Sequence, residues 1–252
     1  PSSLFEDGMI FRLQEFTIAN NRLSGPIKNA AADDNIFITS EESRRRIQKI
    51  DLSYNRFSGK FLLFNSLILL PQLQYLDLSG NMFSGTFPHN NNLILSGSSL
   101  KYIAIADNSF TGELNFFGGL PPTTTTKNNN IHHIDASNNK FYGTIPLLLC
   151  NLPEVTIFNV LNNSFEGSIP SCIGSNLQKT KELNLSHNTL ITGSIPKSFS
   201  QLIELEKIIL TGNNQMTGSI PQEMCSNNNN LKKLDMKYSD IAGTALQCSC
   251  CS

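Results

Sequence analysis

The chain has 252 residues, a net charge of -1 and only 15% charged residues. A balance this close to neutral excludes a protein built around a basic field for nucleic acid or an anionic membrane. Its apolar stretches are shorter than the roughly 18 residues that a membrane-spanning helix needs. We therefore expect contact with a membrane only through segments outside this chain.

One frame recurs along the whole chain and is clearest from Leu73 to Pro88, LQYLDLSGNMFSGTFP. Its pattern is L-x-x-L-x-L-x-x-N-x-F-x-G, and nine copies follow one another with a period of about 24 residues. Such a period is typical of a solenoid, in which each repeat packs only on its neighbours. We predict a single domain over residues 1–252, truncated at its N-terminus because Pro1 falls inside a copy, with a Cys-rich end or cap over residues 244–252.

Each copy combines a short alternating segment with a fixed asparagine. The L-x-L segment predicts a strand with one buried face, and stacked strands would form a parallel sheet along one side of the coil. The asparagine lies where the strand ends, and a buried amide there must bond the backbone of its own and the neighbouring coil. The predicted ladder comprises Asn21, Asn55, Asn81, Asn108, Asn139, Asn163, Asn188 and Asn213.

Two more positions of the frame, after the asparagine, hold the same residue type in most copies. A phenylalanine stands two residues later in five successive copies, which predicts an aromatic spine inside the array. After Leu190 and Met216 the frame gains one residue, so we expect a small bulge there. A glycine follows in every copy, which suggests a backbone angle that other residues avoid or a close approach between coils.

Four copies carry a second signature, G-x-I-P, as at Gly143–Pro146 and Gly167–Pro170. Together with L-x-x-L-x-L-x-x-N it resembles the plant-type leucine-rich repeat, and the resemblance covers essentially the whole chain. It implies an α/β repeat solenoid: a right-handed, curved coil with a parallel sheet on the concave face and few regular helices. The Asn tracts and the Cys-rich end are also similar to those of repeat proteins from diatoms and related algae.

The family includes ectodomains of receptor-like kinases and receptor-like proteins, secreted inhibitors of cell-wall-degrading enzymes, and a few ice-binding proteins. The resemblance therefore implies an extracellular, secreted or cell-surface protein that recognises a protein, peptide or glycan on its concave face. A receptor ectodomain is the first interpretation. A secreted hydrolase inhibitor is the alternative, and ice binding is third because the outward columns are too mixed for a regular array.

The six cysteines suggest an oxidising compartment. Cys150 and Cys172 are less than one period apart, so adjacent coils would bring them together on the convex side, and we predict a disulfide between them. Two buried free thiols are the other reading. Cys225 could pair with one of the three cysteines at the end of the chain, Cys248, Cys250 and Cys251, for which a zinc site is a weaker alternative.

Two N-x-S acceptors, Asn162 and Asn184, are candidates for N-glycosylation in a secreted protein. Asn184 belongs to a predicted strand and faces outward, whereas Asn162 borders the asparagine ladder. A glycan on either would cover part of the concave surface.

The residues that could carry chemistry do not form an active site. His132 and His133 are adjacent, so in a strand they would point in different directions. Asp51, Asp77 and Asp135 share one outward column, where calcium is conceivable but local hydrogen bonds are the favoured reading. The sequence has neither a Gly-rich phosphate loop nor a G-x-S-x-G motif. We expect no catalysis, no cofactor and no metal.

The variable outward positions carry the functional hypothesis. In the third position of successive copies, Tyr75, Tyr102, His133 and Ile157 are consecutive, and stacked coils would merge them into one exposed patch. Ordinary scatter of tyrosines over a β-surface is the competing explanation. The predicted ligand-binding residues are Tyr54, Tyr75, Tyr102, His133 and Ile157, with a basic flank at Lys181, Lys207 and Lys233.

Overall fold

The computed structural model describes residues 13–27, 45–60, 70–86, 99–114, 130–227 and 233–235. Both long insertions and the last cysteines lie outside these residues, as do the side chains of Cys225 and Lys233. No helix within the described ranges is long and apolar enough to cross a membrane.

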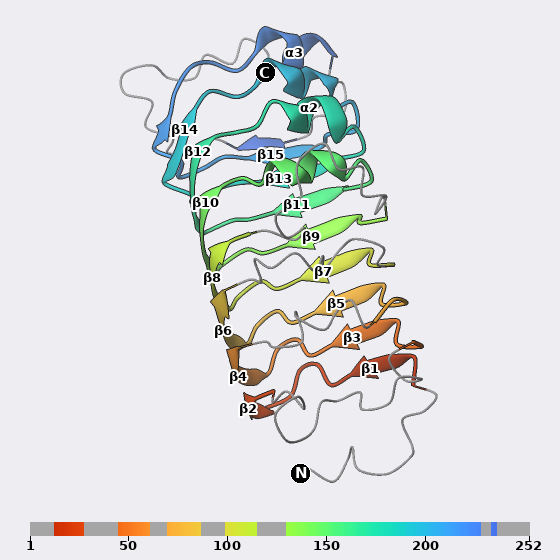
Figure 1. Ribbon diagram of the computed structural model, residues 1–252. Helices are drawn as coiled ribbons and strands as arrows, with labels where there is room; N and C mark the ends of the chain where they lie inside the picture. The colour runs from red at the N-terminus through yellow and green to blue at the C-terminus, as the bar shows by residue number, and fades with distance from the viewer. Residues whose placement is uncertain are drawn as a thin grey trace.

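The coils stack from β1 to the helix α3 as an elongated solenoid (Figure 1), and the predicted parallel sheet is confirmed as a sheet of nine strands. Every outward position pairs with its counterpart in the next coil, from Glu15 opposite Lys49 to Lys207 opposite Lys233. The register is therefore the one that the repeat alignment predicts. The strands are β1 (Glu15–Thr17), β3 (Lys49–Asp51), β5 (Tyr75–Asp77), β7 (Tyr102–Ala104), β9 (His133–Asp135), β11 (Ile157–Asn159), β13 (Glu182–Asn184), β15 (Lys207–Ile209) and β17 (Lys233–Asp235).

A second parallel sheet, of eight strands, was not predicted. Its register slips by two residues from coil to coil, so that Phe83 lies opposite Gly59 and Phe110 opposite Gly85. Both glycines have positive φ, which explains why the frame requires glycine there. The strands are β2 (Ser24–Pro26), β4 (Arg56–Lys60), β6 (Met82–Thr86), β8 (Ser109–Glu113), β10 (Lys140–Thr144), β12 (Ser164–Ser168), β14 (Leu190–Gly193) and β16 (Gln215–Met216).

The fixed asparagines bond two coils at once. The Nδ2 of Asn81 donates to the carbonyls of Leu78 and Ser79 in its own coil and of Leu52 in the preceding coil, at 2.9–3.2 Å. Its Oδ1 accepts the backbone N–H of Phe57, also in the preceding coil, at 3.0 Å. The same pattern recurs at Asn55, Asn108, Asn139, Asn163 and Asn188.

The core between the two sheets contains the expected phenylalanine spine. Phe57, Phe83, Phe110 and Phe141 stack with ring centroids 6.1–6.3 Å apart. One detail of the prediction was wrong: Leu190 is exposed and Ile191 is buried in its place. The residue that this coil gains therefore lies between Asn188 and the buried Ile191, because only that placement puts the apolar side chain of Ile191 in the core.

The residue before each fixed asparagine has positive φ in eight coils, a feature that the sequence reading missed. Small or polar side chains that tolerate this conformation occupy most of these positions. They form a turn column made up of Asn20, Tyr54, Gly80, Asp107, Asn138, Asn162, His187 and Gly212.

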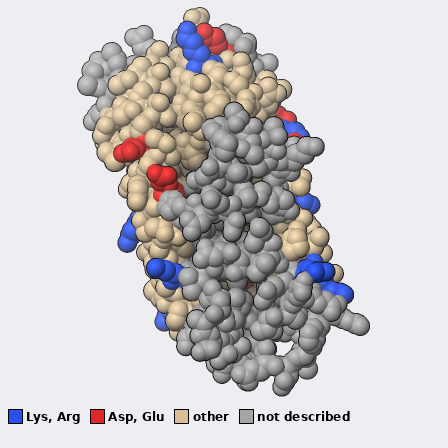
Figure 2. All heavy atoms as spheres, in the orientation of Figure 1, with Lys and Arg blue, Asp and Glu red and all other residues tan. Residues whose placement is uncertain are grey.

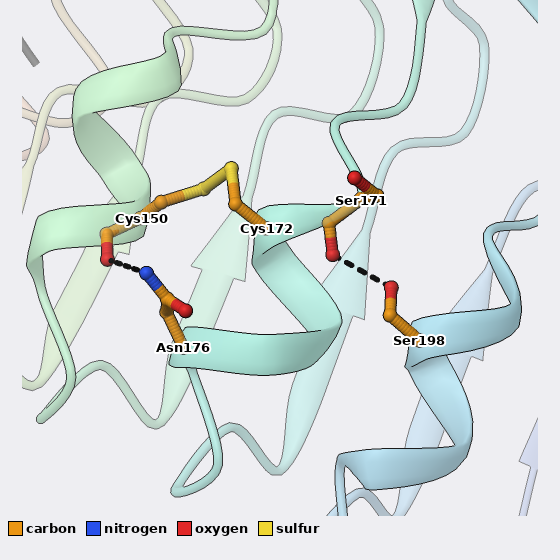
Figure 3. The surroundings of a disulfide bond; sticks show 5 residues. All are labelled: Cys150, Ser171, Cys172, Asn176 and Ser198. Atoms are coloured by element: carbon orange, nitrogen blue, oxygen red, sulfur yellow. Dashed lines mark hydrogen bonds between the residues drawn. A yellow bond between two sulfur atoms is a disulfide. The ribbon is translucent and has the colours of Figure 1, made fainter.

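Four short helices of the described residues stack in the C-terminal half, in the order η5 (Leu147–Asn151), α2 (Cys172–Asn176), η6 (Lys197–Gln201) and α3 (Gln222–Asn227). The predicted disulfide is present and joins Cys150 in η5 to Cys172 in α2, with a Cα–Cα distance of 5.7 Å (Figure 3). Beside it, the Nδ2 of Asn176 donates to the carbonyl of Cys150 at 3.1 Å. The covalent link and the hydrogen bond thus hold the same two coils together.

Replacing both Cys150 and Cys172 with serine is expected to lower the free energy of unfolding by about 3 kcal/mol, because the bond closes a loop with a sequence separation of 22 residues. Urea unfolding of the oxidised wild type and of the double variant measures the difference. Reduced wild type serves as the control and should unfold with the variant. Equal midpoints for the oxidised protein and the variant would contradict a stabilising role.

Candidate ligand-binding face

Four outward side chains of successive coils form a continuous stack, which we call the outer stack: Lys49, Tyr75, Tyr102 and His133. The rings of Tyr75 and Tyr102 are 4.3 Å apart and 6° from parallel, and those of Tyr102 and His133 are 4.3 Å apart and 13° from parallel. The Nζ of Lys49 lies 4.9 Å from the Tyr75 ring centroid, within cation–π range. The predicted patch of Tyr75, Tyr102 and His133 is thus brought together, and it gains Lys49, which the sequence reading left out of the site.

The stacking decides what the outer stack can offer to a ligand. The ring faces of Tyr75 and Tyr102 are occupied by their neighbours, so ring edges and polar ends face outward. The Tyr75 hydroxyl donates to Oδ2 of Asp77 at 3.2 Å, and Oδ1 of Asp77 accepts the backbone N–H of Ser79. This chain of hydrogen bonds fixes the position of the Tyr75 hydroxyl.

The environment keeps the outer stack neutral apart from Lys49. Burial, reinforced by the charge of Asp77, raises the pKa of the Tyr75 hydroxyl far above its usual value, and burial also raises that of Tyr102. Burial lowers the pKa of the His133 imidazole, against the opposing charges of Asp135, Asp77 and Glu182. At neutral pH, the two tyrosines and His133 therefore present polar but uncharged groups.

The lowered pKa of His133 gives stability a pH dependence. Above its unfolded pKa of about 6.5 the imidazole is neutral in both states and contributes nothing. As the pH falls below 6.5, the unfolded chain takes up the proton first, so the free energy of unfolding decreases until the pH passes below the folded pKa.

We expect the wild type to lose more stability between pH 7 and pH 5 than His133→Phe, which keeps a ring in the stack but does not titrate. Urea unfolding of both proteins across this range measures the effect. Parallel pH profiles would contradict it.

The aspartates of the next column accept hydrogen bonds from their own coils. Asp51 and Asp77 lie in adjacent strands, but Ala104 separates Asp77 from Asp135. Oδ1 of Asp135 accepts bonds from the backbone N–H and hydroxyl of Ser137 at 2.9 and 2.7 Å. Within the described ranges, no three His, Cys, Asp or Glu side chains are grouped as a metal site would require.

Tyr54 does not belong to the outer stack. It lies in a turn after β3 with φ of 52°, it is 57% exposed, and its ring rests on Gly80 of the next coil. A Cβ built on Gly80 would come within 2.7 Å of that ring. Tyr54 is therefore an exposed side chain beyond the end of β3. The member of the outer stack in the same coil is Lys49, which stands at the start of that strand.

The predicted basic flank is weaker than its lysine count suggests. The half-buried side chain of Ile157 continues the column after His133, and Lys181 is exposed just before β13. However, the Nζ of Lys207 forms an ion pair with Glu182 at 2.7 Å, because the two residues are opposite each other in adjacent strands. On the side of the molecule drawn in Figure 2, charged residues of the described part are scattered rather than gathered into one patch.

The two glycosylation candidates differ in exposure. Asn162 is exposed in the turn column, where its Nδ2 donates to Oδ1 of Asn138 at 3.0 Å. Asn184 is only 7% exposed, and its Oδ1 accepts bonds from the backbone N–H and hydroxyl of Ser186. A side chain facing outward from a strand is thus still buried when its neighbours in the column stand close on both sides.

Three segments of the chain match the family model of the Leucine Rich Repeat: residues 72–92, 130–152 and 179–202. The repeats of these segments are therefore leucine-rich repeats. The chain is 35% identical over 157 residues to Receptor-like protein 6 of Arabidopsis thaliana, a match that covers 62% of this chain and 14% of the relative. Receptor-like protein 54 of the same plant is 33% identical over 99 residues, 39% of this chain and 11% of the relative.

Solved structures of plant receptors have the same architecture. A TDR receptor superposes with a TM-score of 0.76 and 26% identity over 94% of this chain and 36% of the receptor. The Arabidopsis receptor kinase HAESA, in complex with the peptide hormone IDA and the co-receptor SERK1, gives 0.72 and 29% over 88% and 33% of the two chains. The present chain therefore spans about a third or less of the length of these relatives.

Proposed function

We propose that this chain is part of a non-catalytic, extracellular receptor-like ectodomain, and that it binds a protein or peptide ligand across the outward face of its nine-stranded sheet. The outer stack forms the centre of the binding surface. Ile157 and the exposed Lys181 extend it toward the C-terminal coils.

The observation that carries the proposal is the stack of Lys49, Tyr75, Tyr102 and His133. Four side chains at freely variable positions of the frame are held in one arrangement over four coils. A ligand would find these groups already ordered, and ordered aromatic side chains are frequent hot spots of protein interfaces. Nothing in the coil itself requires aromatic residues at these outward positions.

The arrangement of the rings favours a polypeptide over a glycan. Sugars typically bind aromatic residues through an open ring face, whereas the faces of Tyr75 and Tyr102 are covered on both sides. Ring edges and hydroxyl groups suit aliphatic side chains, aromatic faces and main-chain amides. The HAESA structure, with a bound peptide hormone, supports the same ligand class.

Location and lack of catalysis are supported by separate observations. The disulfide between Cys150 and Cys172 fits an oxidising compartment, and the relatives named above are receptor-like proteins. A plant ice-binding protein shares the fold at 20% identity and a TM-score of 0.58, which supports the fold alone. No contact within the described ranges favours an inhibitor of a hydrolase over a receptor.

The test compares three immobilised proteins: wild type, Tyr102→Ala and Tyr142→Ala. Tyr142 is the matched control, because it is 52% exposed but lies on the second sheet, in β10. Each is exposed to extracellular fluid and to a library of secreted peptides, and retained polypeptides are identified and titrated. We expect a ligand held by wild type and Tyr142→Ala whose affinity falls at least tenfold with Tyr102→Ala.

A ligand that binds all three proteins equally would contradict a site on the outer stack. Loss of binding with Tyr142→Ala but not with Tyr102→Ala would move the site to the second sheet. Circular dichroism of the three proteins excludes misfolding as the cause of any loss.

A further inference from the structure

We propose that Asn162 carries an N-linked glycan and that Asn184, the other acceptor sequence, does not. The proposal rests on the secretory route that the proposed function implies. In this modification the Nδ2 of Asn162 attacks C1 of an oligosaccharide linked to lipid pyrophosphate. A C–N bond forms, the pyrophosphate lipid leaves, and the nitrogen gives up one of its two protons.

The position of Asn162 in the fold suits a bulky substituent. It stands in the turn between β11 and β12 with φ of 53°, and both Asn162 and Ser164 of its acceptor sequence are exposed. Its amide donates to Asn138 at 3.0 Å, a bond that one remaining proton is able to keep. Asn163, between the two acceptor-sequence residues, points its amide inward to the carbonyls of Ala136 and Val160. The coil is therefore fixed by Asn163 while Asn162 remains outside.

Asn184 has the opposite surroundings. In its strand it lies between Asn159 and Ile209 of the adjacent coils, and the hydroxyl of Ser186 donates to its Oδ1 at 2.6 Å. Both residues of this acceptor sequence are buried, with 7% and 3% of their surfaces exposed. A sugar on Asn184 would have to displace these contacts in the middle of the sheet, so a chain modified there would fold poorly.

The glycan on Asn162 would leave the proposed binding surface open. His133 is the first residue of β9, whereas Asn138 and Asn162 belong to the turn column beyond the ends of the strands. The sugar would therefore cover the edge of the sheet at which the strands end, whereas the outer stack lies at the edge at which they begin. A ligand would approach from the side on which the strands begin.

The test is occupancy of each site in the protein secreted from plant cells behind a heterologous signal peptide. The variants are Ser164→Ala, which removes the first acceptor sequence at an exposed residue, and Asn184→Asp, which removes the second but keeps an oxygen for Ser186. Peptide N-glycosidase treatment in heavy-oxygen water, followed by peptide mass spectrometry, locates each former glycan as a labelled aspartate. We expect wild type and Asn184→Asp to be modified at residue 162, and Ser164→Ala to be unmodified.

Secreted, folded wild type without sugar at Asn162, or with sugar at Asn184, would overturn the proposal. Because secretion is imposed by the added signal peptide, this result does not depend on whether the chain is a receptor. Titration of the ligand found with the outer stack tests the proposed function separately, and we expect Ser164→Ala to bind it within twofold of wild type.

Discussion

Replacing Asn188 with alanine is expected to lower the free energy of unfolding by about 4 kcal/mol, a large effect for a single side chain. The side chain is fully buried, its Nδ2 donates to the carbonyls of Val160, Leu185 and Ser186, and its Oδ1 accepts the N–H of Phe165. Alanine removes four hydrogen bonds in a site that water does not reach. The amide of Phe165 loses its acceptor, whereas the three carbonyls keep other donors in Asn163, Asn213 and Asn162. A lost buried hydrogen bond costs about 1 kcal/mol, and an amide left unsatisfied costs more.

Urea unfolding measures the total effect, and hydrogen exchange of the Phe165 amide reports the lost bond directly. Asn21→Ala is the matched control, because Asn21 has the same place in the frame but is exposed, and its bonds to described residues go to carbonyls of its own coil. We expect the control to lose about 0.5 kcal/mol, as exposed residues usually do. Equal losses at the two positions would show that the bond between coils contributes nothing.

Gly174→Ala is expected to destabilise the protein by about 2 kcal/mol, even though alanine favours a helix. Gly174 is a buried residue of α2, and a Cβ built on it would come within 2.2 Å of the backbone carbon of Ser198 in η6. Backbone atoms cannot turn away as a flexible side chain does. The two helices would have to separate, which would also break the hydrogen bond from the Ser198 hydroxyl to the carbonyl of Ser171 (Figure 3).

Ser175→Ala, at the exposed neighbouring position of the same helix, controls for the change in helix propensity and should alter stability by about 0.5 kcal/mol or less. Thermal and urea unfolding of both variants provide the comparison. A Gly174→Ala protein as stable as the control would mean that α2 and η6 separate without cost.

The register of the nine-stranded sheet could be predicted because one side-chain position is repeated in every coil. Aligning the chain on Asn81 and its equivalents places Tyr75 beside Tyr102, and the structure has the same pairing. The disulfide followed for the same reason, since Cys150 and Cys172 occupy nearly equivalent positions in adjacent coils. In a repeat protein, residues far apart in the sequence can thus be predicted to be in contact when they occupy equivalent positions of adjacent coils.

The second sheet could not be predicted in this way. Its strands contain the frame's glycine, as in Ser109–Glu113, and glycine is rare in strands, so the sequence suggested turns. Leu190 and Ile191 were indistinguishable, because both are apolar and only burial decides which one fills the core.

The members of the outer stack were predicted except for Lys49, but their geometry was not. The column contained Tyr75, Tyr102 and His133, yet their parallel stacking depends on side-chain rotamers that the spacing of strands leaves open. The ion pair between Lys207 and Glu182 was available from the register and was overlooked because lysines were counted without their neighbours. Tyr54 was included in the predicted site because nothing in its immediate sequence marks the turn conformation that it adopts.

The direction of the asparagine bonds has a consequence for the growing polypeptide on the ribosome. The amide of Phe83 donates to the side chain of Asn108, which is synthesised 25 residues later, and the carbonyl of Leu78 accepts a bond from the same side chain. A coil is therefore completed only by its successor. During translation, the newest coil therefore lacks these bonds until its successor has been synthesised and packed against it.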